Sequence, residues 1–327
     1  MIWFPFSFYT QPVRAGSPRV GTGSWRSRRL GLLLLVLGAL SSLAWGSWLS
    51  PVSAKTTVLK VVAGENFWGS LASQLGGRLV QVTSIVTDPN ADPHEYESNS
   101  ADARAFAQAR YVVINGAGYD QWANRLLSAQ SAPGRRVLNV ASLLHRREGD
   151  NPHFWYDPSD VFQVIDRITQ DYRALEPQGG AYFEARHAAV EAALSPYRAH
   201  LAYLRRHFSG AKVAATESIF SYLASYLHLH LTTPLAFMKA VSEGIDPPAS
   251  AVAAFEQQLS QRSFRALVYN RQTITPLTTG IRQRALAEGI PVVAVTETIE
   301  PPRATFEQWM DSQLSSLTTA LAKRGRG

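Results

Sequence analysis

The chain has 327 residues, of which 46% are hydrophobic and 17% are charged, and its formal net charge is +7. This composition is typical of a globular protein, and the length is sufficient for two domains of ordinary size. Five of the arginines lie in residues 1–54, which contain no Asp or Glu, so the rest of the chain is close to neutral. The charge therefore indicates no basic surface, and we expect no nucleic-acid partner.

Residues 1–54 are predicted to direct export. A basic stretch ending at Arg29 precedes an apolar run over residues 30–49, and the small residues Ser53 and Ala54 follow. This order is typical of a cleaved signal peptide, but about 20 apolar residues also suffice for a membrane anchor. Both alternatives place the folded part in the periplasm or at the extracellular face of the cell membrane, and membrane association through residues 30–49 stays open.

The part that follows the leader alternates predicted strands with predicted helices. The periodicity predicts strands at 57–64, 78–86, 110–118 and 135–140, and helices at 65–77, 100–109 and 119–129. Such alternation favours a parallel sheet with helices on both faces.

Residues 181–208 break this rhythm. They contain no glycine and a single proline, Pro196, and their apolar spacing is helical. One helix of this length spans roughly 40 Å at 1.5 Å per residue. Pro196 is expected either to kink the helix or to mark a junction between two helices. The helix is either an ordinary surface helix or a rigid connector.

The strand–helix rhythm resumes after this helix. Strands are predicted at 211–216, 264–270 and 290–297, and helices at 217–227, 250–262, 276–289 and 304–323. The predicted fold class is therefore α/β, with two lobes of mainly parallel sheets flanked by helices and joined by one long helix. We assign residues 55–178 to the N-terminal lobe, 179–208 to the connecting helix and 209–327 to the C-terminal lobe.

Two of the eight histidines share an unusual setting. His94, in "ADPHEYE", and His153, in "DNPHFWYDP", each follow a proline in a loop that comes after a predicted strand. Proline biases the preceding residue to extended geometry, and ligands of open α/β sheets bind beyond the carboxyl ends of strands. Their similar placement makes both histidines candidate metal ligands.

The other histidines have simpler interpretations. His187, His200 and His207 fall in the long helix and are expected at solvated positions, and His145 is expected on a surface loop. His228 and His230 alternate, so they would point to one face of a strand. That pair could bind a metal, although a half-exposed strand explains it as well.

Two glutamates occupy comparable positions in the second half. Glu217 follows the strand at 211–216 and begins a helix, where its charge would also favour the helix dipole. Glu297 ends the strand at 290–297, and its simple interpretation is an exposed strand end. Two imidazoles and two carboxylates would neutralise a divalent cation. Because the chain has no cysteine, this donor set suits Mn²⁺, Zn²⁺ or Fe²⁺.

Four motifs in this order support one family. They are "DPHEYE" at 92–97, "NPHFWYDP" at 151–158, "ATESIFSYL" at 215–223 and "VVAVTET" at 292–298. At these motifs the chain resembles the metal-binding substrate-binding proteins of bacterial ABC transporters, in the manganese and zinc group that has a long connecting helix.

The resemblance implies a set of four ligands. His94 and His153 would come from the N-terminal lobe, and Glu217 lies where the family carries its third ligand. Glu297 lies where the family usually has aspartate, so its extra methylene changes the reach of the carboxylate. Asn151 stands where an aspartate is common, a change expected to matter little.

The resemblance also implies a function. The protein would capture Mn²⁺ or Zn²⁺ in the cleft between the lobes and deliver it to an ABC transporter permease. It would act as a monomer and not as an enzyme. The ligand types favour Mn²⁺ slightly, Zn²⁺ has the higher intrinsic affinity, and Fe²⁺ fits the same donors. The alternative is an exported metal-dependent hydrolase, which would need an open coordination position. An adhesion role also stays open.

Overall fold

The computed structural model of the chain describes residues 58–90, 92–130 and 132–323. The chain divides into a unit of residues 1–54 and a compact unit of residues 55–327, and the fold described below is that of the second unit. The predicted leader, with its apolar run at 30–49, lies outside the described residues. None of the helices within the described ranges is both long and apolar enough to cross a membrane.

The first sheet has four parallel strands in the order β2-β1-β3-β4. They are β1 Leu59–Glu65, β2 Val80–Val86, β3 Tyr111–Ile114 and β4 Arg136–Asn139. Strand order reverses between β1 and β3, so the loops beyond these strand ends flank a crevice of the kind that binds ligands in open α/β sheets.

Helices cover both faces of this sheet. They are α1 Asn66–Gly76, α2 Ser100–Gln108, α3 Gln121–Ala129, the short α4 Val140–Leu143, and α5 Pro158–Leu175. Side chains alternate along β1, so Val61 and Ala63 join the large core that includes α1 and α5, whereas Val62 packs with residues of α2 and α3. Burial on both faces explains why the central strand β3 is continuously apolar, whereas the edge strands β2 and β4 carry polar residues at exposed or half-buried positions.

The second sheet repeats the topology of the first. Its parallel strands lie in the order β6-β5-β7-β8. They are β5 Lys212–Ala215, β6 His230–Leu231, β7 Leu267–Asn270 and β8 Val292–Val295. The helices of this part are α8 Ser221–Tyr226, α9 Leu235–Ser242, α10 Ala249–Ser260, α11 Pro276–Ala287 and α12 Phe306–Ala322. Two parallel sheets with flanking helices confirm the predicted fold class.

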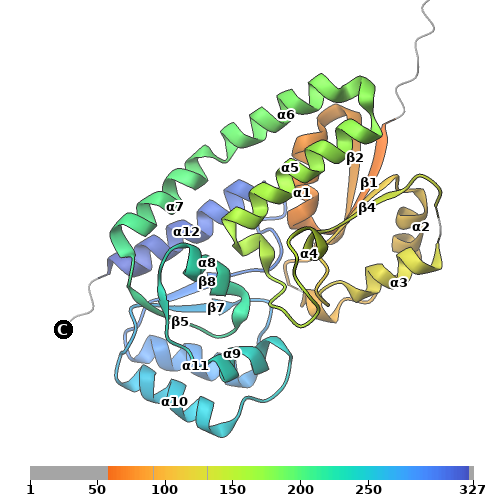
Figure 1. Cartoon of the computed structure of the whole chain (residues 1–327). Coiled ribbons are helices and arrows are strands. Elements are labelled where there is room, and N and C mark those ends of the chain that lie inside the picture. The colour runs from red at the N-terminus through yellow and green to blue at the C-terminus, as the bar shows by residue number, and fades with distance from the viewer. Residues whose placement is uncertain (1–57, 91, 131, 324–327) are drawn as a thin grey trace, which may run out of the picture. The chain divides into compact units, whose positions relative to one another are not determined.

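The connection between the sheets consists of two consecutive helices, α6 Gly180–Ala193 and α7 Ser195–Phe208, which run from one sheet to the other (Figure 1). The single helix predicted over residues 181–208 is interrupted at Leu194. Pro196 lies in the first turn of α7, where a backbone N–H would have no partner within the helix, so its absence costs no hydrogen bond. The N–H of Leu194 still bonds to the Val190 carbonyl. The structure therefore has a helix junction at this point, which is one of the two roles predicted for Pro196. The lobe boundaries themselves stay a prediction.

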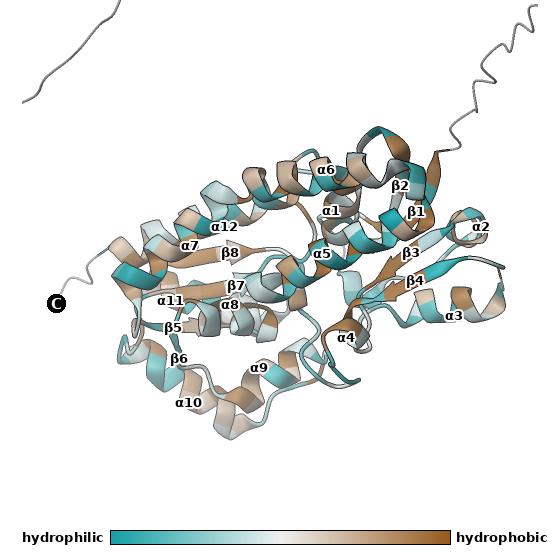
Figure 2. Cartoon of the chain, turned by 45° about the horizontal axis from the view of Figure 1, so that its top comes forward, coloured by the Kyte–Doolittle hydropathy of each residue, from teal (hydrophilic) through white to brown (hydrophobic). Residues whose placement is uncertain are grey.

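The long C-terminal helix α12 packs against both α7 and β8. Its buried residues Trp309 and Leu314 belong to the same core cluster as Val61 of β1. One continuous apolar core thus joins the two sheets on the side of the connecting helices, and the central strands are among the most hydrophobic elements in Figure 2. A shared core of this kind favours a small change in lobe orientation over a wide opening.

Three local features differ from the sequence prediction. Helices α5 and α9 were not predicted, although Asp157 caps α5 and Pro158 begins it, which is a strong start signal. Strand β6 contains only His230 and Leu231, and His228 lies before it in a left-handed turn with φ of 57°. The prediction that His228 and His230 share one strand face is therefore wrong.

Candidate metal centre

The four predicted ligands all follow the carboxyl end of a strand. His94 lies in a short 3₁₀ turn, Pro93–Glu95, after β2. His153 directly precedes a 3₁₀ turn in the loop that follows α4, the short helix beyond the end of β4. Glu217 comes two residues after β5, and Glu297 two residues after β8. Because both sheets are parallel, these loops gather where the two sheets face each other.

Three of the four side chains converge. The Nε2 atom of His94 lies 3.3 Å from Oε2 of Glu297, and the Nε2 atom of His153 lies 3.7 Å from the same oxygen. One ligand atom from each of these residues fits within 4.8 Å of the others. Two nitrogens and an oxygen at this spacing are a donor set for a transition metal.

Glu217 lies beside this group but is not part of it. Its Oε1 accepts a hydrogen bond from Nδ2 of Asn270 at 2.7 Å, and the same nitrogen donates to Oε1 of Glu297 at 2.6 Å. Its Oε2 is buried and has no hydrogen-bond partner. The side chain makes no capping bond to the helical turn that follows, so a helix cap does not explain this glutamate. Its role as the fourth ligand stays a prediction.

The site is almost closed to solvent. Glu297 and His153 are fully buried, Glu217 is 1% exposed, and the His94 side chain is 26% exposed. The alternative of an exposed strand end for Glu297 is therefore wrong. His94 is the side chain through which this group of residues reaches solvent.

Burial and charge set the proton positions of the unliganded site. Burial opposes protonation of His94, but the charge and hydrogen bond of Glu297, with Asp92 and Glu217, raise the pKa of His94 to about 9. Burial would raise the pKa of Glu297, but the two histidines hold it well below its usual range. Without metal, protonated His94 and ionised Glu297 therefore form an ion pair.

The pKa values of His153 and Glu217 shift in the directions that favour their neutral forms. Burial lowers the pKa of His153, against the opposing effect of Glu297. Burial and then the charge of Glu297 raise the pKa of Glu217. A neutral imidazole is the form that binds metal, so His153 is ready for an ion, whereas His94 must first lose its proton.

Asn151 orients His153. Its Oδ1 lies 2.6 Å from Nδ1 of His153, and its Nδ2 donates to the carbonyl of Ser218 in the second lobe. An oxygen at Nδ1 assigns the proton of the neutral ring to that nitrogen, which leaves Nε2 free to bind a cation. The asparagine keeps the acceptor that an aspartate would supply, but without its charge.

Sequence reasoning missed two residues that contact Glu297. The hydroxyl of Tyr119 donates to Glu297 Oε2 at 2.6 Å, and Asn270 holds Oε1. Tyr119 is carried by the turn after β3, where Gly116 has φ of 79° and any side chain would clash with Asn139 and Ala141. The glycines of "NGAGYD" signalled this turn. Nothing in the sequence signalled that the tyrosine reaches a carboxylate 178 positions away.

The remaining candidates lie apart from the site. His145, His207, His228 and His230 are exposed, as are Glu95 and Glu97. His187 pairs with Asp166 across α5 and α6. His200 is not simply solvated, because its ring lies between Asp311 and Thr318 of α12.

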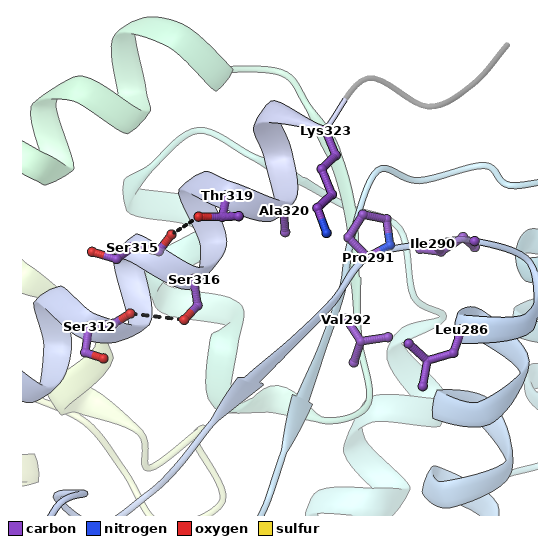
Figure 3. A pocket seen from close by; sticks show the side chains of 11 residues that line it. Leu286, Ile290, Pro291, Val292, Ser312, Ser315, Ser316, Thr319, Ala320 and Lys323 are labelled. Carbon is purple, nitrogen blue, oxygen red and sulfur yellow. Dashed lines mark hydrogen bonds between the residues drawn. The ribbon is translucent and has the colours of Figure 1, made fainter.

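A hollow of about 680 Å³ lies at the opposite end of β8 from Glu297 (Figure 3). It is lined by residues of α12, such as Ser316 and Thr319, and by residues near the start of β8, such as Pro291 and Val292. None of its lining residues is His, Asp or Glu, so this hollow does not provide a transition-metal site.

Two similar α/β lobes, with two histidines and one glutamate converging between them, are typical of the metal-binding substrate-binding proteins of bacterial ABC transporters. Comparison with known families agrees. The family described as "Zinc-uptake complex component A periplasmic" matches residues 61–320, and the chain belongs to this family. The resemblance inferred from the four motifs is thereby confirmed, and this family is a component of metal transport rather than an enzyme family.

Several characterised proteins are similar to the chain. The manganese-binding lipoprotein MntA of Halalkalibacterium halodurans is 29% identical over 132 residues, which are 39% of this chain and 43% of that protein. The iron-binding protein YfeA of Yersinia pestis is 28% identical over 204 residues, 58% of this chain and 64% of that protein. Each match spans less than two thirds of the relative's length.

Solved structures share the fold. The periplasmic zinc-binding protein TroA of Treponema pallidum superposes with a TM-score of 0.68 at 15% identity, covering 80% of this chain and 99% of that one. The SBP FpvC of Pseudomonas aeruginosa in complex with Mn²⁺ gives 0.67 at 18% identity, covering 82% and 99%. At this identity the likeness concerns the fold alone.

Proposed function

We propose that the protein captures a divalent transition-metal ion between its two lobes and delivers it to the membrane permease of an ABC transporter. The observation that carries this proposal is the convergence of His94 and His153 from one lobe with Glu297 from the other. An ion bound there is held by both lobes at once. Capture of cargo can then be coupled to the relative position of the lobes.

The chemistry of the donors supports a reversible carrier. The donors are His94 Nε2, His153 Nε2 and Glu297 Oε2, and Glu217 is proposed as the fourth ligand through its unpaired Oε2. Nitrogen and carboxylate donors suit Zn²⁺, Mn²⁺ and Fe²⁺. Relatives are named for manganese, iron and zinc, which supports a transition metal as cargo.

The family description supports the setting of this function. It names a periplasmic component of an uptake complex, and the predicted leader is consistent with export. Lobes of residues 55–178 and 209–327, joined at 179–208, would act as a monomer at the periplasmic or extracellular face of the membrane. The permease is the partner that this proposal requires.

An exported metal-dependent hydrolase is disfavoured by the site. A hydrolytic centre needs an open metal position for water and a base beside it. Here Glu297 already contacts a tyrosine and an asparagine, and Glu217 is bonded to the same asparagine. These contacts favour holding an ion over activating water.

Metal titration tests the proposal. Protein comprising residues 55–327 is purified without chelator, stripped, and titrated with Zn²⁺ and with Mn²⁺ by calorimetry. We expect one ion per chain, and loss of at least 100-fold in affinity for His153→Ala, because removing one ligand from a four-ligand site eliminates a metal–nitrogen bond. Wild-type protein that binds neither ion, or His153→Ala with unchanged affinity, contradicts the proposal.

Delivery is tested separately. The chain and the permease from the same source are produced in a bacterium that lacks its own zinc and manganese uptake proteins. We expect metal accumulation with the wild-type chain and background levels with His153→Ala. Hydrolysis of a panel of ester and peptide substrates by the metal-loaded protein would favour the enzyme instead.

A further inference from the structure

The carboxylate of Glu297 is held on three sides. Its Oε2 accepts from the hydroxyl of Tyr119 at 2.6 Å. Its Oε1 accepts from Nδ2 of Asn270 at 2.6 Å and, more distantly, from Oγ1 of Thr273 at 3.4 Å. A carboxylate has about four acceptor positions. Three of them are therefore occupied by neutral donors, and the fourth, on Oε2, faces the two histidines.

The orientation of both principal donors is fixed by other contacts. The Oδ1 atom of Asn270 accepts from the backbone N–H of Gln272 at 3.0 Å, so its Nδ2 must face the acids. The ring of Tyr119 packs edge-on against His94 at 4.8 Å and Trp155 at 5.2 Å between centroids. Tyr119 and Asn270 are 5% and 1% exposed. Neither donor can turn to water without leaving a buried polar group unpaired, which is costly.

We propose that Tyr119 is a positioning residue of the metal site. Asn270 and Thr273 occupy Oε1 of Glu297, and the bond from Tyr119 to Oε2 keeps the carboxylate from turning, so that the carboxylate, clamped in this way, offers a bound ion Oε2 alone. Tyr119 acts from the lobe that carries both histidines on an acid of the other lobe. It does not need to touch the ion. The proposal rests on the proposed function, because it specifies how that site presents one of its ligands.

One-oxygen binding limits the coordination number and thereby the choice of ion. Zn²⁺ accepts four ligands in a tetrahedral arrangement, whereas Mn²⁺ suits sites richer in oxygen and close to octahedral. A glutamate that cannot bind through both oxygens withholds a ligand from Mn²⁺ and none from Zn²⁺. The clamp therefore favours Zn²⁺, although the ligand types considered alone favour Mn²⁺ slightly.

The test is Tyr119→Phe, which keeps the ring and removes only the hydroxyl, so that the carboxylate can turn about its remaining bond to Asn270 and bring Oε1 as well as Oε2 to the ion. Dissociation constants for Zn²⁺ and Mn²⁺ are measured by competition, and the visible absorption of Co²⁺-loaded protein reports coordination number, because four-coordinate Co²⁺ absorbs far more strongly than six-coordinate Co²⁺. We expect the preference for Zn²⁺ over Mn²⁺ to fall about tenfold, equivalent to one charge-assisted hydrogen bond, and the Co²⁺ bands to weaken.

The matched control is Tyr111→Phe. Tyr111 is equally buried and its hydroxyl donates to a carboxylate, that of Asp171, at 2.8 Å, but outside the site. A merely structural role for Tyr119 would lower stability, as this control does, and leave both the metal preference and the Co²⁺ spectrum unchanged. That result overturns the clamp.

A second variant keeps the test decisive if Tyr119→Phe does not fold. Thr273→Val preserves the shape of a half-buried side chain and removes the weaker bond to Oε1. It is expected to shift the metal preference in the same direction by a smaller factor, and an unchanged preference overturns the clamp. Wild-type protein that binds neither ion overturns the proposed function and the clamp together. Tight wild-type binding with unaffected variants overturns the clamp alone.

Discussion

At the scale of residues, the positions of the proposed metal-binding atoms depend on neighbouring side chains that are not themselves proposed as ligands. His153 presents Nε2 because Asn151 holds Nδ1, and Glu297 presents one oxygen because Tyr119 and Asn270 hold the carboxylate. Such supporting contacts orient ligands and set which proton must leave.

Asn151→Ala should weaken metal binding by about 10- to 100-fold, because the ring of His153 would lose the contact that selects its tautomer. Calorimetric titration with Zn²⁺ measures the change. Asn99→Ala is the matched control, since the side chain of Asn99 bonds to the backbone of α2. It should lower the free energy of unfolding by about 1 kcal/mol and leave affinity unchanged. Equal affinity in both variants would refute the orienting role of Asn151.

Metal affinity should rise with pH between 6 and 8. The unliganded protein holds a proton on His94, whose pKa is raised to about 9, and metal binding requires that this proton leave. The gain is about tenfold per pH unit for each proton displaced, and it ends as pH passes the pKa of His94. Titrations in buffers of different ionisation enthalpy count the released protons. Binding that is independent of pH in this range argues against His94 as a ligand.

The residues that could be predicted from sequence are those with a local signature. His94 and His153 stand behind prolines after strands, and Glu217 and Glu297 follow strands of apolar residues. Tyr119 and Asn270 have no such signature, because their role depends on which side chains the fold brings opposite them. The hydrogen bonds that these two residues donate to Glu297 could therefore not be predicted from the sequence.

At the scale of elements, α12 supports the loops that carry two of the predicted ligands. The Oε1 atom of Gln313 accepts from the Tyr156 hydroxyl, three residues after His153, and from the N–H of Thr296, which precedes Glu297. Trp309 of the same helix donates to Oγ1 of Thr296. One helix thus ties a loop of each lobe to the shared core.

Gln313→Ala should lower the free energy of unfolding by about 1–3 kcal/mol, because it leaves the backbone N–H of Thr296 without its acceptor. The Tyr156 hydroxyl keeps its bond to the Thr296 carbonyl. The substitution should also weaken metal binding, since both ligand loops lose a tether. Urea denaturation and zinc titration measure these effects. Ser316→Ala on the exposed side of α12 is the control, and should change neither. A loss of stability in Gln313→Ala with unchanged affinity would confine α12 to a structural role.

The elements were predicted unevenly, for physical reasons. Strands buried on both faces, such as β3, are continuous apolar runs and are easily recognised. The left-handed turn at His228 could not be predicted, because only a few per cent of non-glycine residues have positive φ, even though histidine is enriched among them. Helix α5 could have been predicted, because the sequence shows its N-cap residue Asp157, the proline that begins it and a helical spacing of apolar residues. Pro196 predicted either a kink or a junction in the long connecting helix, and the structure has a junction at Leu194.

At the scale of the whole molecule, the two lobes share a core on one side and face the candidate site on the other. An ion that contacts both lobes stabilises the folded state against the unfolded one as a single unit. At a free concentration of 100 times the dissociation constant, the added free energy of unfolding is about 2.7 kcal/mol.

Calorimetry should therefore show one unfolding transition of residues 55–327 that moves to higher temperature with Zn²⁺. The Glu297→Gln variant should show a much smaller shift, because it lacks the carboxylate that joins the lobes through the ion. Two transitions, of which one moves and the other does not, would indicate lobes that unfold independently. No shift with Zn²⁺ or with Mn²⁺ would indicate that neither binds.

The most direct measurement is the anomalous diffraction of crystals grown from Zn²⁺-loaded protein. We expect one strong peak per chain at about 2.0–2.2 Å from Nε2 of His94, Nε2 of His153 and Oε2 of Glu297. A peak at another position, or coordination without either histidine, would contradict the proposed capture of metal between the two lobes.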